Sequence, residues 1–484
     1  MEVKLGRNAA PDADADAIVV IEWEGSPRAE FEKPLAALYS SGEIRGKRSE
    51  FTLLHGLAGW KARRVLIAGA GKRDKFDAAA LRNLAGAAVR LLKGKGVSTL
   101  AIALEDGFNS PEFASAAVEG VMLGAWEPDY LKTNKEEKDK PVESLTIAST
   151  SEDAALPAAL ERGRTIAEAA NLTRDIAVEP PNLLNPLALA DRARRMAESA
   201  GLAFEVLDQN RMRQLGMGAL LGVAQGSAAP PALIVMRYTP EKPSADHLAI
   251  IGKGVTFDTG GISIKPSEHM DQMKYDMAGG AAVIGAMQAI AKLRPQVAVT
   301  GFVPAVENMP GSRAQRPGDI VTSLSGKTIE VLNTDAEGRL ILADAITYAK
   351  QLGATHLVDA ATLTGAIVVA LGGASSGVFS NNDALLERWM AAAKQSGDKM
   401  WHMPLYDDYR DLLKSVYADI QNIGPRWGGA CTAAMFLKEF AGDTPWVHID
   451  VAGTAWLDDS KPHLAKGPTA IPLASFVTLA MNWH

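Results

Sequence analysis

The most constraining feature of the sequence is a charged stretch in apolar surroundings, Asn-Thr-Asp-Ala-Glu-Gly-Arg-Leu at residues 333–340. An apolar extended run precedes it, and a segment with helical character, Leu340 to Leu352, follows. Because Asp335 and Glu337 are two apart, an extended chain directs both carboxylates to one face, and Gly338 lets the backbone turn before the helix. Two oxygen ligands on one face suit a hard divalent cation. The pattern equally suits a helix start, with Asp335 as the cap and Glu337 in the first turn.

A second acidic cluster lies upstream. The apolar run from His247 to Ile251 predicts a strand that ends in Gly-Lys-Gly-Val-Thr-Phe-Asp-Thr-Gly-Gly, a segment that contains Lys253 and Asp258. Lys265 and Asp276 follow a short distance along the chain. These side chains lie at or near the ends of predicted strands, which is where open α/β sheets place their ligand crevices.

The charge balance of the two clusters favours a pair of metal ions. They contribute four carboxylates, from Asp258, Asp276, Asp335 and Glu337. Two divalent cations would neutralise these charges, whereas four carboxylates that meet without cations repel one another and tend to take up protons. The alternative is an ion-pair cluster, in which Lys253 and Lys265 act as ordinary ammonium partners of the carboxylates.

Together the two motifs resemble those of the leucyl aminopeptidases, the cytosolic two-metal exopeptidases. The resemblance extends from about Asn171 to the C-terminus. It includes Lys-Pro-Ser at residues 265–267 and Met-Asp-Gln-Met-Lys-Tyr-Asp-Met at residues 270–277. The N-terminal third resembles the family only in its length and α/β pattern. We therefore expect a metal-dependent aminopeptidase that hydrolyses the N-terminal residue of peptides with a hydroxide that bridges two divalent metals.

The resemblance also implies a ligand set for each metal. One metal would be bound by Lys253, Asp258, Asp276 and Glu337, and the other by Asp258, Asp335 and Glu337. The expected cofactors are two divalent ions per subunit, Mn²⁺ or Zn²⁺, together with bicarbonate. Lys253 is the least intuitive ligand, because a lysine binds metal only as the neutral amine. Lowering its pKa from about 10.4 to 7 costs roughly 4 to 5 kcal/mol.

Two further residues have catalytic roles by resemblance. Lys265 would polarise the scissile carbonyl and stabilise the tetrahedral intermediate, for which it must stay protonated. Arg339 would hold the bicarbonate ion that helps move a proton from the bridging water. A bidentate guanidinium suits such an anion. No histidine lies within either motif core, so the usual imidazole base is not expected here.

The expected pocket for the first substrate side chain is small and largely apolar. The resemblance places these residues at the substrate cleft: Met273, Asn333, Ala336, Thr362, Leu363 and Gly365, with Ala455 as a further member. Such a lining fits leucine or another aliphatic side chain. The alternative for any one of them, and for Met273 above all, is plain packing. The resemblance also implies a homohexamer.

Length and composition set the remaining bounds. A chain of 484 residues with 47% hydrophobic and 22% charged residues predicts a globular protein with a large core and two domains. We expect an N-terminal α/β domain at 1–150, a connecting helix at 151–172 and a catalytic domain at 173–484. The opening residues lack the pattern of a secretory signal, no apolar run is long enough to span a bilayer, and the single cysteine, Cys431, suits a reducing compartment. A cytoplasmic protein without membrane partners is the simplest expectation.

Strands and helices alternate along both predicted domains. Ala17 to Trp23 reads as a strand, Ala78 to Leu92 as a helix and Ala154 to Asn171 as the connecting helix. Such alternation predicts an α/β fold in which each domain has a mainly parallel or mixed sheet flanked by helices. The Gly-rich stretch Gly222 to Pro231 reads as a loop, and the charged run Thr133 to Lys140 as a solvated loop.

Three other functions were weighed against the metallopeptidase. Gly-Ala-Gly-Lys at residues 69–72 follows a strand but lacks the full spacing of a phosphate loop. Gly-Ala-Ser-Ser-Gly at residues 373–377 matches the pattern of a serine-hydrolase elbow around Ser375, which would need a strand before it and a helix directly after it. DNA binding is known in some bacterial members of the family. A net charge of −7 and the lack of a basic cluster in the N-terminal domain argue against nucleic acid as a main partner.

Overall fold

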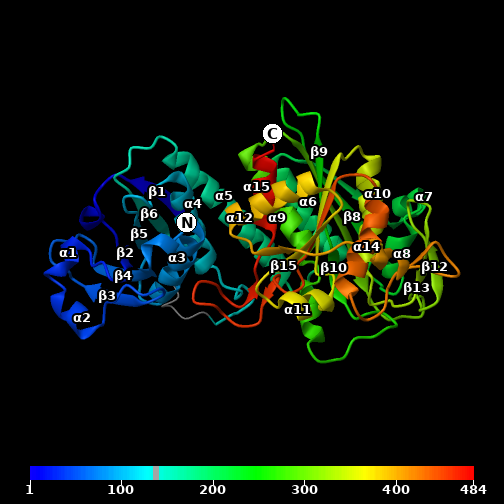
Figure 1. Cartoon of the computed structure of the whole chain (residues 1–484), viewed down its shortest axis with the longest axis horizontal. Helices are drawn as coiled ribbons and strands as arrows, with labels where there is room; N and C mark the ends of the chain where they lie inside the picture. Colours follow the sequence, from blue (N-terminus) through cyan, green and yellow to red (C-terminus); the bar gives the residue numbers. More distant parts are fainter. Residues whose placement is uncertain (135–140, 484) are drawn as a thin grey trace. The chain divides into compact units, whose positions relative to one another are not determined.

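The computed structural model describes residues 1–134 and 141–483. The chain forms two compact units, Met1–Asn171 with Asp458–Lys466, and Leu172–Leu457 with Gly467–His484. Each unit contains one large sheet with helices on its faces (Figure 1). The division falls inside α5 (Leu156–Val178), a helix of 23 residues that connects the two parts of the chain. The predicted fold class, α/β with two helix-flanked sheets and a connecting helix, is confirmed.

The sheet of the first unit has six strands in the order β1-β6-β5-β2-β4-β3. Neighbouring strands are parallel except for β3 and β4. The strands are β1 (Glu2–Gly6), β2 (Ala17–Trp23), β3 (Phe51–His55), β4 (Arg64–Gly71), β5 (Thr99–Ala103) and β6 (Ser144–Ala148). The central strand β2 is buried along its whole length, as its nearly continuous apolar sequence requires of a strand covered on both faces.

Helices cover both faces of this first sheet. On one face α3 (Ala78–Leu92) packs against α4 (Pro111–Ala125), and the buried side chains of α3 include Leu81, Leu84 and Ala88. Asp77 caps α3 by accepting a hydrogen bond from the backbone N–H of Ala80. The other face is covered by a smaller cluster that includes residues of α1 (Ala29–Glu32) and the segment around α2 (Ala36–Ser41).

The second unit is built on a nine-stranded mixed sheet. Its order is β16-β15-β18-β14-β9-β11-β8-β7, and β10 also pairs with β11. The strands are β7 (Ala203–Leu207), β8 (Ala232–Tyr238), β9 (His247–Gly252), β10 (Gly254–Asp258), β11 (Ala298–Asn308), β14 (His356–Ala361), β15 (Ser376–Ser380), β16 (Met400–His402) and β18 (Trp446–Asp450). The central strands β18, β14, β9 and β11 are parallel, so their carboxyl ends meet at one edge.

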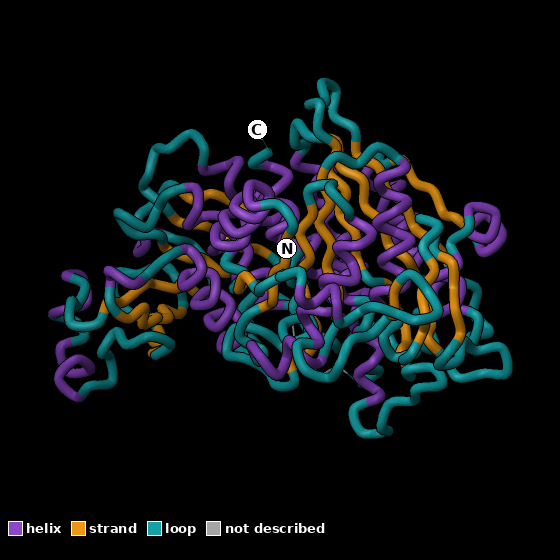
Figure 2. The backbone as a smooth tube through the Cα atoms, turned by 45° about the vertical axis from the view of Figure 1, so that its right-hand side comes forward, coloured by secondary structure: helices purple, strands orange, loops and turns teal. Residues whose placement is uncertain are grey.

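Helices lie on both sides of this second sheet, as Figure 2 shows. One side has α6 (Pro186–Ala200), α9 (Ala278–Leu293), α12 (Asp383–Ser396) and α15 (Leu473–Met481). The other has α8 (Gly218–Ala224), α10 (Gly338–Gln351) and α14 (Gly429–Ala441). Shorter helices are α7 (Gln209–Leu215), α11 (Gly365–Leu371) and α13 (Asp408–Asp411). The smaller sheets contain β12 (Asp319–Thr322), β13 (Thr328–Val331) and β17 (Ile420–Gln421), and β19 (Trp456–Leu457) with β20 (Gly467–Pro468).

The structure does not form the serine-hydrolase elbow that was considered around Ser375. The apolar run before Ser375 is helix α11, and a strand, β15, begins directly after it, which reverses the required order. Ser375 Oγ donates to the carbonyl of Ser376 at 3.3 Å, and none of the histidines that the structure describes hydrogen-bonds to it. Asn382 caps α12, which begins only at Asp383, by accepting from the N–H of Leu385.

Of the two glycine-rich stretches considered above, one forms a loop only in part and the other ends a strand. The Gly222 to Pro231 stretch is a loop only in part, because its first three residues complete α8. The Gly-Ala-Gly-Lys stretch ends β4, and a short 3₁₀ turn, η2 (Arg73–Lys75), follows before α3, so no helix begins where a phosphate loop needs one. Of the charged run Thr133 to Lys140, residues 135–140 lie outside the described residues.

Candidate metal centre

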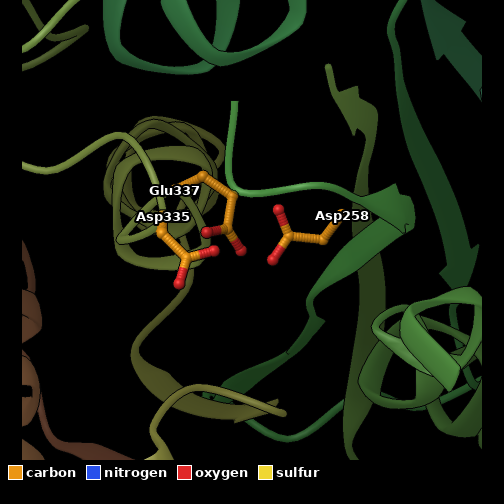
Figure 3. A group of neighbouring side chains, drawn as sticks. All are labelled: Asp258, Asp335 and Glu337. Carbon is orange, nitrogen blue, oxygen red and sulfur yellow. The ribbon is translucent and has the colours of Figure 1, made fainter. Parts of the chain in front are cut away.

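Three carboxylates converge at the edge where the parallel strands of the second sheet end. Asp258 is the last residue of β10, while Asp335 and Glu337 lie directly before α10. Each of the three offers an oxygen that lies within 4.8 Å of the others. Figure 3 shows the three carboxylates directed toward one another. This geometry suits a divalent cation, and it arises because the two motifs end on neighbouring elements.

The helix-cap alternative for this acidic pair is wrong. Helix α10 begins at Gly338, and no side chain at its N-cap position, Glu337, makes a capping hydrogen bond. The N–H of Asp335 instead donates to Oδ1 of Asn333 at 2.8 Å, which turns the chain sharply before the helix. The carboxylates of Asp335 and Glu337 are therefore left for the cluster.

Two lysines connect the carboxylates of the cluster. Lys253 Nζ lies 2.8 Å from Asp276 Oδ1 and 2.7 Å from Glu337 Oε1. Lys265 Nζ lies 2.8 Å from Asp258 Oδ2 and 2.5 Å from Asp335 Oδ1. These contacts are the ion pairs expected if Lys253 and Lys265 act as ordinary ammonium partners of the carboxylates. Four carboxylates and two ammonium groups nevertheless leave a net charge of 2 − 4 = −2 in a largely buried cluster.

Asp276 completes the acidic group from a third segment of the chain. It follows the 3₁₀ helix η3 (Met270–Tyr275), and its Oδ1 accepts from the hydroxyl of Thr362 at 2.7 Å as well as from Lys253. Its second oxygen, Oδ2, is buried and has no hydrogen-bond partner among residues 1–134 and 141–483. A buried carboxylate oxygen without a donor is costly, so this atom is an available ligand position that points to a bound cation.

The electrostatics of the cluster follow from burial and mutual repulsion. Burial raises the pKa of Asp335 to about 6, with Asp258 adding to the rise and Lys265 opposing it. The pKa of Asp276 is raised in the same way by burial against the opposing pull of Lys253. For Lys253 burial favours the neutral amine, but the carboxylates of Asp276 and Glu337 outweigh it and hold the pKa above its ordinary value.

Arg339 extends the site from the first turn of α10. Its Nη1 donates to the carbonyl of Asn422 at 2.8 Å, and the residue is only 5% exposed. Its Nε is buried with no hydrogen-bond partner in the part of the chain that the structure describes. Burial lowers the pKa of this guanidinium to about 10, partly against the attraction of Glu337. A buried guanidinium with an unpartnered N–H beside the cluster has the chemistry to hold a small anion.

Three supporting residues were not predicted from the sequence. Asn308 donates from Nδ2 to Asp258 Oδ1 at 2.8 Å, and Asn422 donates to the carbonyl of Asn333 at 2.7 Å. Asp450 accepts from the N–H of Leu363 at 3.1 Å. Asn308 and Asp450 are the last residues of the apolar strands β11 and β18. A polar residue at the carboxyl end of such a strand was the sequence feature that could have identified both as site residues.

Two glycines allow the close approach of the motifs. A Cβ on Gly338 would lie 2.8 Å from Cε of Lys253, so a larger residue would displace that lysine. Gly260 has a φ of +84°, and a Cβ there would lie 2.8 Å from Oδ1 of Asp335. The glycines of both motifs are therefore required by packing at the cluster.

The residues expected to bind substrate lie in or beside the segments that carry the cluster, and only Ala455 of that set lies outside these segments. Thr362 contacts Asp276 directly, Ala336 separates Asp335 from Glu337 in the chain, and the carbonyl of Met273 accepts from the N–H of Asp276 at 3.4 Å. Asn333 and Leu363 belong to the two loops that carry these residues, and Gly365 is the first residue of α11. Ala455 is buried at 1% exposure, and its carbonyl accepts from Thr469.

The chain matches the models of a known protein family. The model of the cytosol aminopeptidase family, catalytic domain, matches residues 171–477, and that of the family's N-terminal domain matches residues 25–135. The chain belongs to the cytosol aminopeptidase family. It is accordingly a metal-dependent aminopeptidase, as the sequence motifs predicted.

Relatives of high identity cover the whole chain. A probable cytosol aminopeptidase of Solibacter usitatus is 58% identical over 484 residues, with 100% of both chains covered. A probable cytosol aminopeptidase of Koribacter versatilis is 46% identical, again with 100% of both chains covered. The family resemblance therefore includes the N-terminal part, where the sequence motifs gave no signal.

Solved structures share the fold over nearly the whole length. A mutant of tomato leucine aminopeptidase superposes with a TM-score of 0.90 at 33% identity, and 99% of this chain and 96% of that chain are covered. The bottromycin maturation enzyme BotP in complex with Mn gives a TM-score of 0.87 at 32% identity, with 96% and 99% covered. The Mn in that family relative agrees with the acidic cluster found here.

Proposed function

We propose that the chain removes N-terminal residues, preferably leucine or other apolar residues, from peptides at a site that holds two divalent cations. The proposed ligands are Lys253, Asp258, Asp276, Asp335 and Glu337. The observation that carries the proposal is the buried, unpartnered Oδ2 of Asp276 beside a three-carboxylate cluster of excess negative charge. We propose further that the catalytic function resides in residues 173–484, with 1–150 as a separate domain and 151–172 as the connector.

The ligand set fits two cations chemically. Oxygen donors suit Mn²⁺, Mg²⁺ and Zn²⁺ alike, so the identity of the metal depends on availability as well as on ligand type. Lys253 can join the ligands only as the neutral amine. The carboxylates that now hold its proton would be neutralised by divalent cations, which reverse the local field and favour loss of that proton. Bound cations supply Lewis acidity and lower the pKa of a water molecule toward neutrality.

Lys265 and Arg339 have the proposed catalytic roles. Lys265 is held as an ammonium group by the carboxylates of Asp258 and Asp335, and it is less buried than Lys253. A fixed positive charge with partial access suits a donor to the substrate carbonyl, where negative charge develops during attack. Arg339 has a buried Nε available for a bicarbonate ion, which would accept a proton and return it.

The same acidic site explains why a free amino terminus would be required. The neutral amine of a free terminus can donate its nitrogen lone pair to a cation, whereas the nitrogen of an acylated terminus is an amide nitrogen without a basic lone pair. We propose that Met273, Asn333, Ala336, Thr362, Leu363 and Gly365 hold the first residue of the substrate. Since the side chains of this set are mostly small or apolar, an aliphatic residue would bind best.

Assembly and location form a further part of the proposal. Several large apolar side chains of the second unit are exposed, including Val369 at 90%, Val416 at 91% and Trp427 at 77%. Such side chains commonly mark an interface between protein chains, which supports association between subunits. The proposed assembly is the homohexamer that the family resemblance implies. No helix in the described ranges is long and apolar enough to cross a membrane. An unpaired cysteine, Cys431, and relatives named as cytosol enzymes support a cytoplasmic location.

Hydrolysis of leucine p-nitroanilide tests the proposal. The purified protein is assayed as isolated, after removal of metal by a chelator, and after addition of Mn²⁺ or Zn²⁺. We expect activity to disappear and then return with metal, and N-acetyl-leucine p-nitroanilide to remain uncleaved throughout. Full activity after metal removal, confirmed by elemental analysis, would overturn the proposed metal site, and cleavage of the acetylated substrate would overturn the exopeptidase assignment.

A further inference from the structure

A second polar pocket lies entirely within the first unit. It has a volume of about 230 Å³ and is lined by residues at the end of β4, by residues of α3 and by the segment Asp458–Lys466. Its polar side chains are those of Arg48, Ser49, Asn83 and His463. No Asp or Glu occurs among the described residues that line it. The chain has seven more acidic than basic residues, so a pocket lined by an arginine and by no acid differs from the average charge of the protein.

Close backbone packing brings Arg48 and His463 to this pocket. A Cβ on Gly69 would lie 2.1 Å from the carbonyl oxygen of Lys47, and one on Gly71 would lie 3.3 Å from Cβ of Arg48. These glycines of the Gly-Ala-Gly-Lys stretch therefore serve to admit the 46–48 segment. On the opposite side, a Cβ on Gly86 of α3 would lie 2.9 Å from the carbonyl oxygen of His463. The backbone thus presents both residues at fixed positions on the pocket.

In the part of the chain whose side chains the structure describes, Arg48 makes no ion pair with a carboxylate, and neither ring nitrogen of His463 has a hydrogen-bond partner. Two acidic residues of the first unit are paired with other arginines, Glu119 with Arg82 and Glu127 with Arg90. An exposed guanidinium and a partly buried imidazole that line one cavity, with no acid in its lining, form a site that can accept an anion.

The field in the pocket is positive. Burial lowers the pKa of His463 to about 4, and the charges of Lys461, Arg82, Arg48 and Arg90 lower it further. At neutral pH the imidazole is therefore neutral, with one N–H donor. An anion placed beside it would offset the four cations and favour its protonation.

We propose that the pocket between Arg48 and His463 binds a compact oxyanion, the phosphate group of a small molecule. Its volume lies below the range of roughly 300–1,000 Å³ typical of sites for drug-sized ligands, which favours a small group. Arg48 can donate to two phosphate oxygens at once, while Asn83, Ser49 and His463 supply further donors. This site differs from a phosphate loop, because no glycine loop at a helix N-terminus forms it. It also belongs to the first unit, whereas the proposed catalytic cluster belongs to the second.

Isothermal titration of the holoenzyme with sulfate and with inorganic phosphate tests the proposal, with ionic strength held constant by chloride. We expect saturable binding of one anion per subunit that Arg48→Gln weakens at least tenfold. Lys47→Gln is the matched control, because it removes one exposed charge beside the pocket without altering its lining. Circular dichroism and thermal melts of both variants establish that they fold. Equal weakening by the two substitutions, or binding that Arg48→Gln leaves undiminished, would overturn the proposal.

The pH dependence gives a second, independent test. Sulfate keeps its double charge between pH 7.5 and 5.5, so any tightening of its binding over this range comes from the protein. We expect tighter binding at pH 5.5 in the wild type and not in His463→Gln, since only the wild type gains a proton with the anion. An identical pH dependence in both proteins would contradict the role of His463. Titration with phosphate and with a nucleoside monophosphate then distinguishes a free ion from a phosphorylated ligand. Saturable binding of either one that depends on Arg48 supports the site.

Discussion

Oδ2 of Asp450 accepts a hydrogen bond from the hydroxyl of Thr364 at 2.6 Å, and this contact ties the end of β18 to the loop that follows β14. Oδ1 of Asp450 accepts from the N–H of Leu363 in the same loop. The preceding residue, Thr362, donates its hydroxyl to Asp276, while its carbonyl accepts from Lys253 at 2.9 Å. Asp450 therefore positions a loop that reaches the proposed metal ligands.

We expect Asp450→Ala to lower kcat/KM for leucine p-nitroanilide by about tenfold or more, because a hydrogen bond to a charged group contributes roughly 1.5–3 kcal/mol. Asp450→Asn retains an acceptor for the N–H of Leu363 and should recover a large part of the loss. The exposed Asp443→Asn is the matched control. If Asp450→Asn and Asp450→Ala lose activity equally while their thermal stabilities differ, the positioning role is wrong.

Lys265 should contribute to the rate without being needed for metal binding. We expect Lys265→Ala to lower kcat by about 10²–10³-fold, the range found when a donor to a developing oxyanion is removed. The metal content per subunit should stay at the wild-type level, because the ammonium group is not a proposed ligand. Elemental analysis and steady-state kinetics on the same preparation measure both quantities. A loss of metal that parallels the loss of activity would contradict this division of roles.

Gly338 gives a test of the geometry of Lys253. The Cβ of Gly338→Ala would lie 2.8 Å from Cε and 3.0 Å from Nζ of Lys253, so the lysine must move away from Asp276 and Glu337. The clash is with the flexible end of a side chain, so the fold should survive. We expect a fall in activity on the order of 10–100-fold, since small displacements at a reacting centre are costly. A thermal melt accompanies the assay, and unchanged kinetics would show that Lys253 need not hold its position.

Asp344 predicts a pH-dependent stability that is independent of the metal centre. This fully buried residue of α10 accepts from the N–H groups of Leu220 and Leu324, and burial raises its pKa to about 7. Since the unfolded chain has the ordinary value near 3.8, the neutral acid favours the folded state. The stability from this group is fully present below about pH 4 and is lost as the pH rises to 7, by up to about 4 kcal/mol.

Denaturant unfolding of wild type and Asp344→Asn between pH 4.5 and 7.5 measures this effect. Asparagine keeps one acceptor and cannot ionise, so we expect the stability difference between the two proteins to shift in favour of the variant as the pH rises. Comparing the two proteins at each pH cancels titrations that they share, including those of the metal ligands. A difference that is constant with pH would show that Asp344 ionises as easily in the folded chain as in the unfolded one.

The acidic part of the site was predictable because its residues are close together in the sequence. Asp335 and Glu337 are two apart, and Asp258 belongs to a glycine-rich motif, so strand ends and spacing were enough to group them. Asp450 and Thr364 are 86 residues apart, and no local pattern links a lone aspartate at a strand end to a loop so distant. The spacing also could not distinguish Lys253 as a metal ligand from Lys253 as an ion-pair partner.

Short elements are harder to predict from the sequence than long ones. The run of Ala, Ile, Val and Leu in the short apolar helix α11 has no polar face to reveal a helical period. At α12 the cap is Asn382, a role that depends on the hydrogen bond from Leu385. Long elements with a clear period, such as α3 and β2, matched their predicted bounds.

The central claim is that the four carboxylates hold two catalytic divalent cations. Its most direct test is the metal content per subunit, measured by elemental mass spectrometry beside leucine p-nitroanilide hydrolysis, in wild type and in Glu337→Ala, with the exposed Asp408→Ala as control. The account predicts about two metals in the wild type and the control, and a large loss of both metal and activity in Glu337→Ala. A Glu337→Ala protein that retains wild-type turnover, or a wild type that is fully active when free of metal, would contradict it.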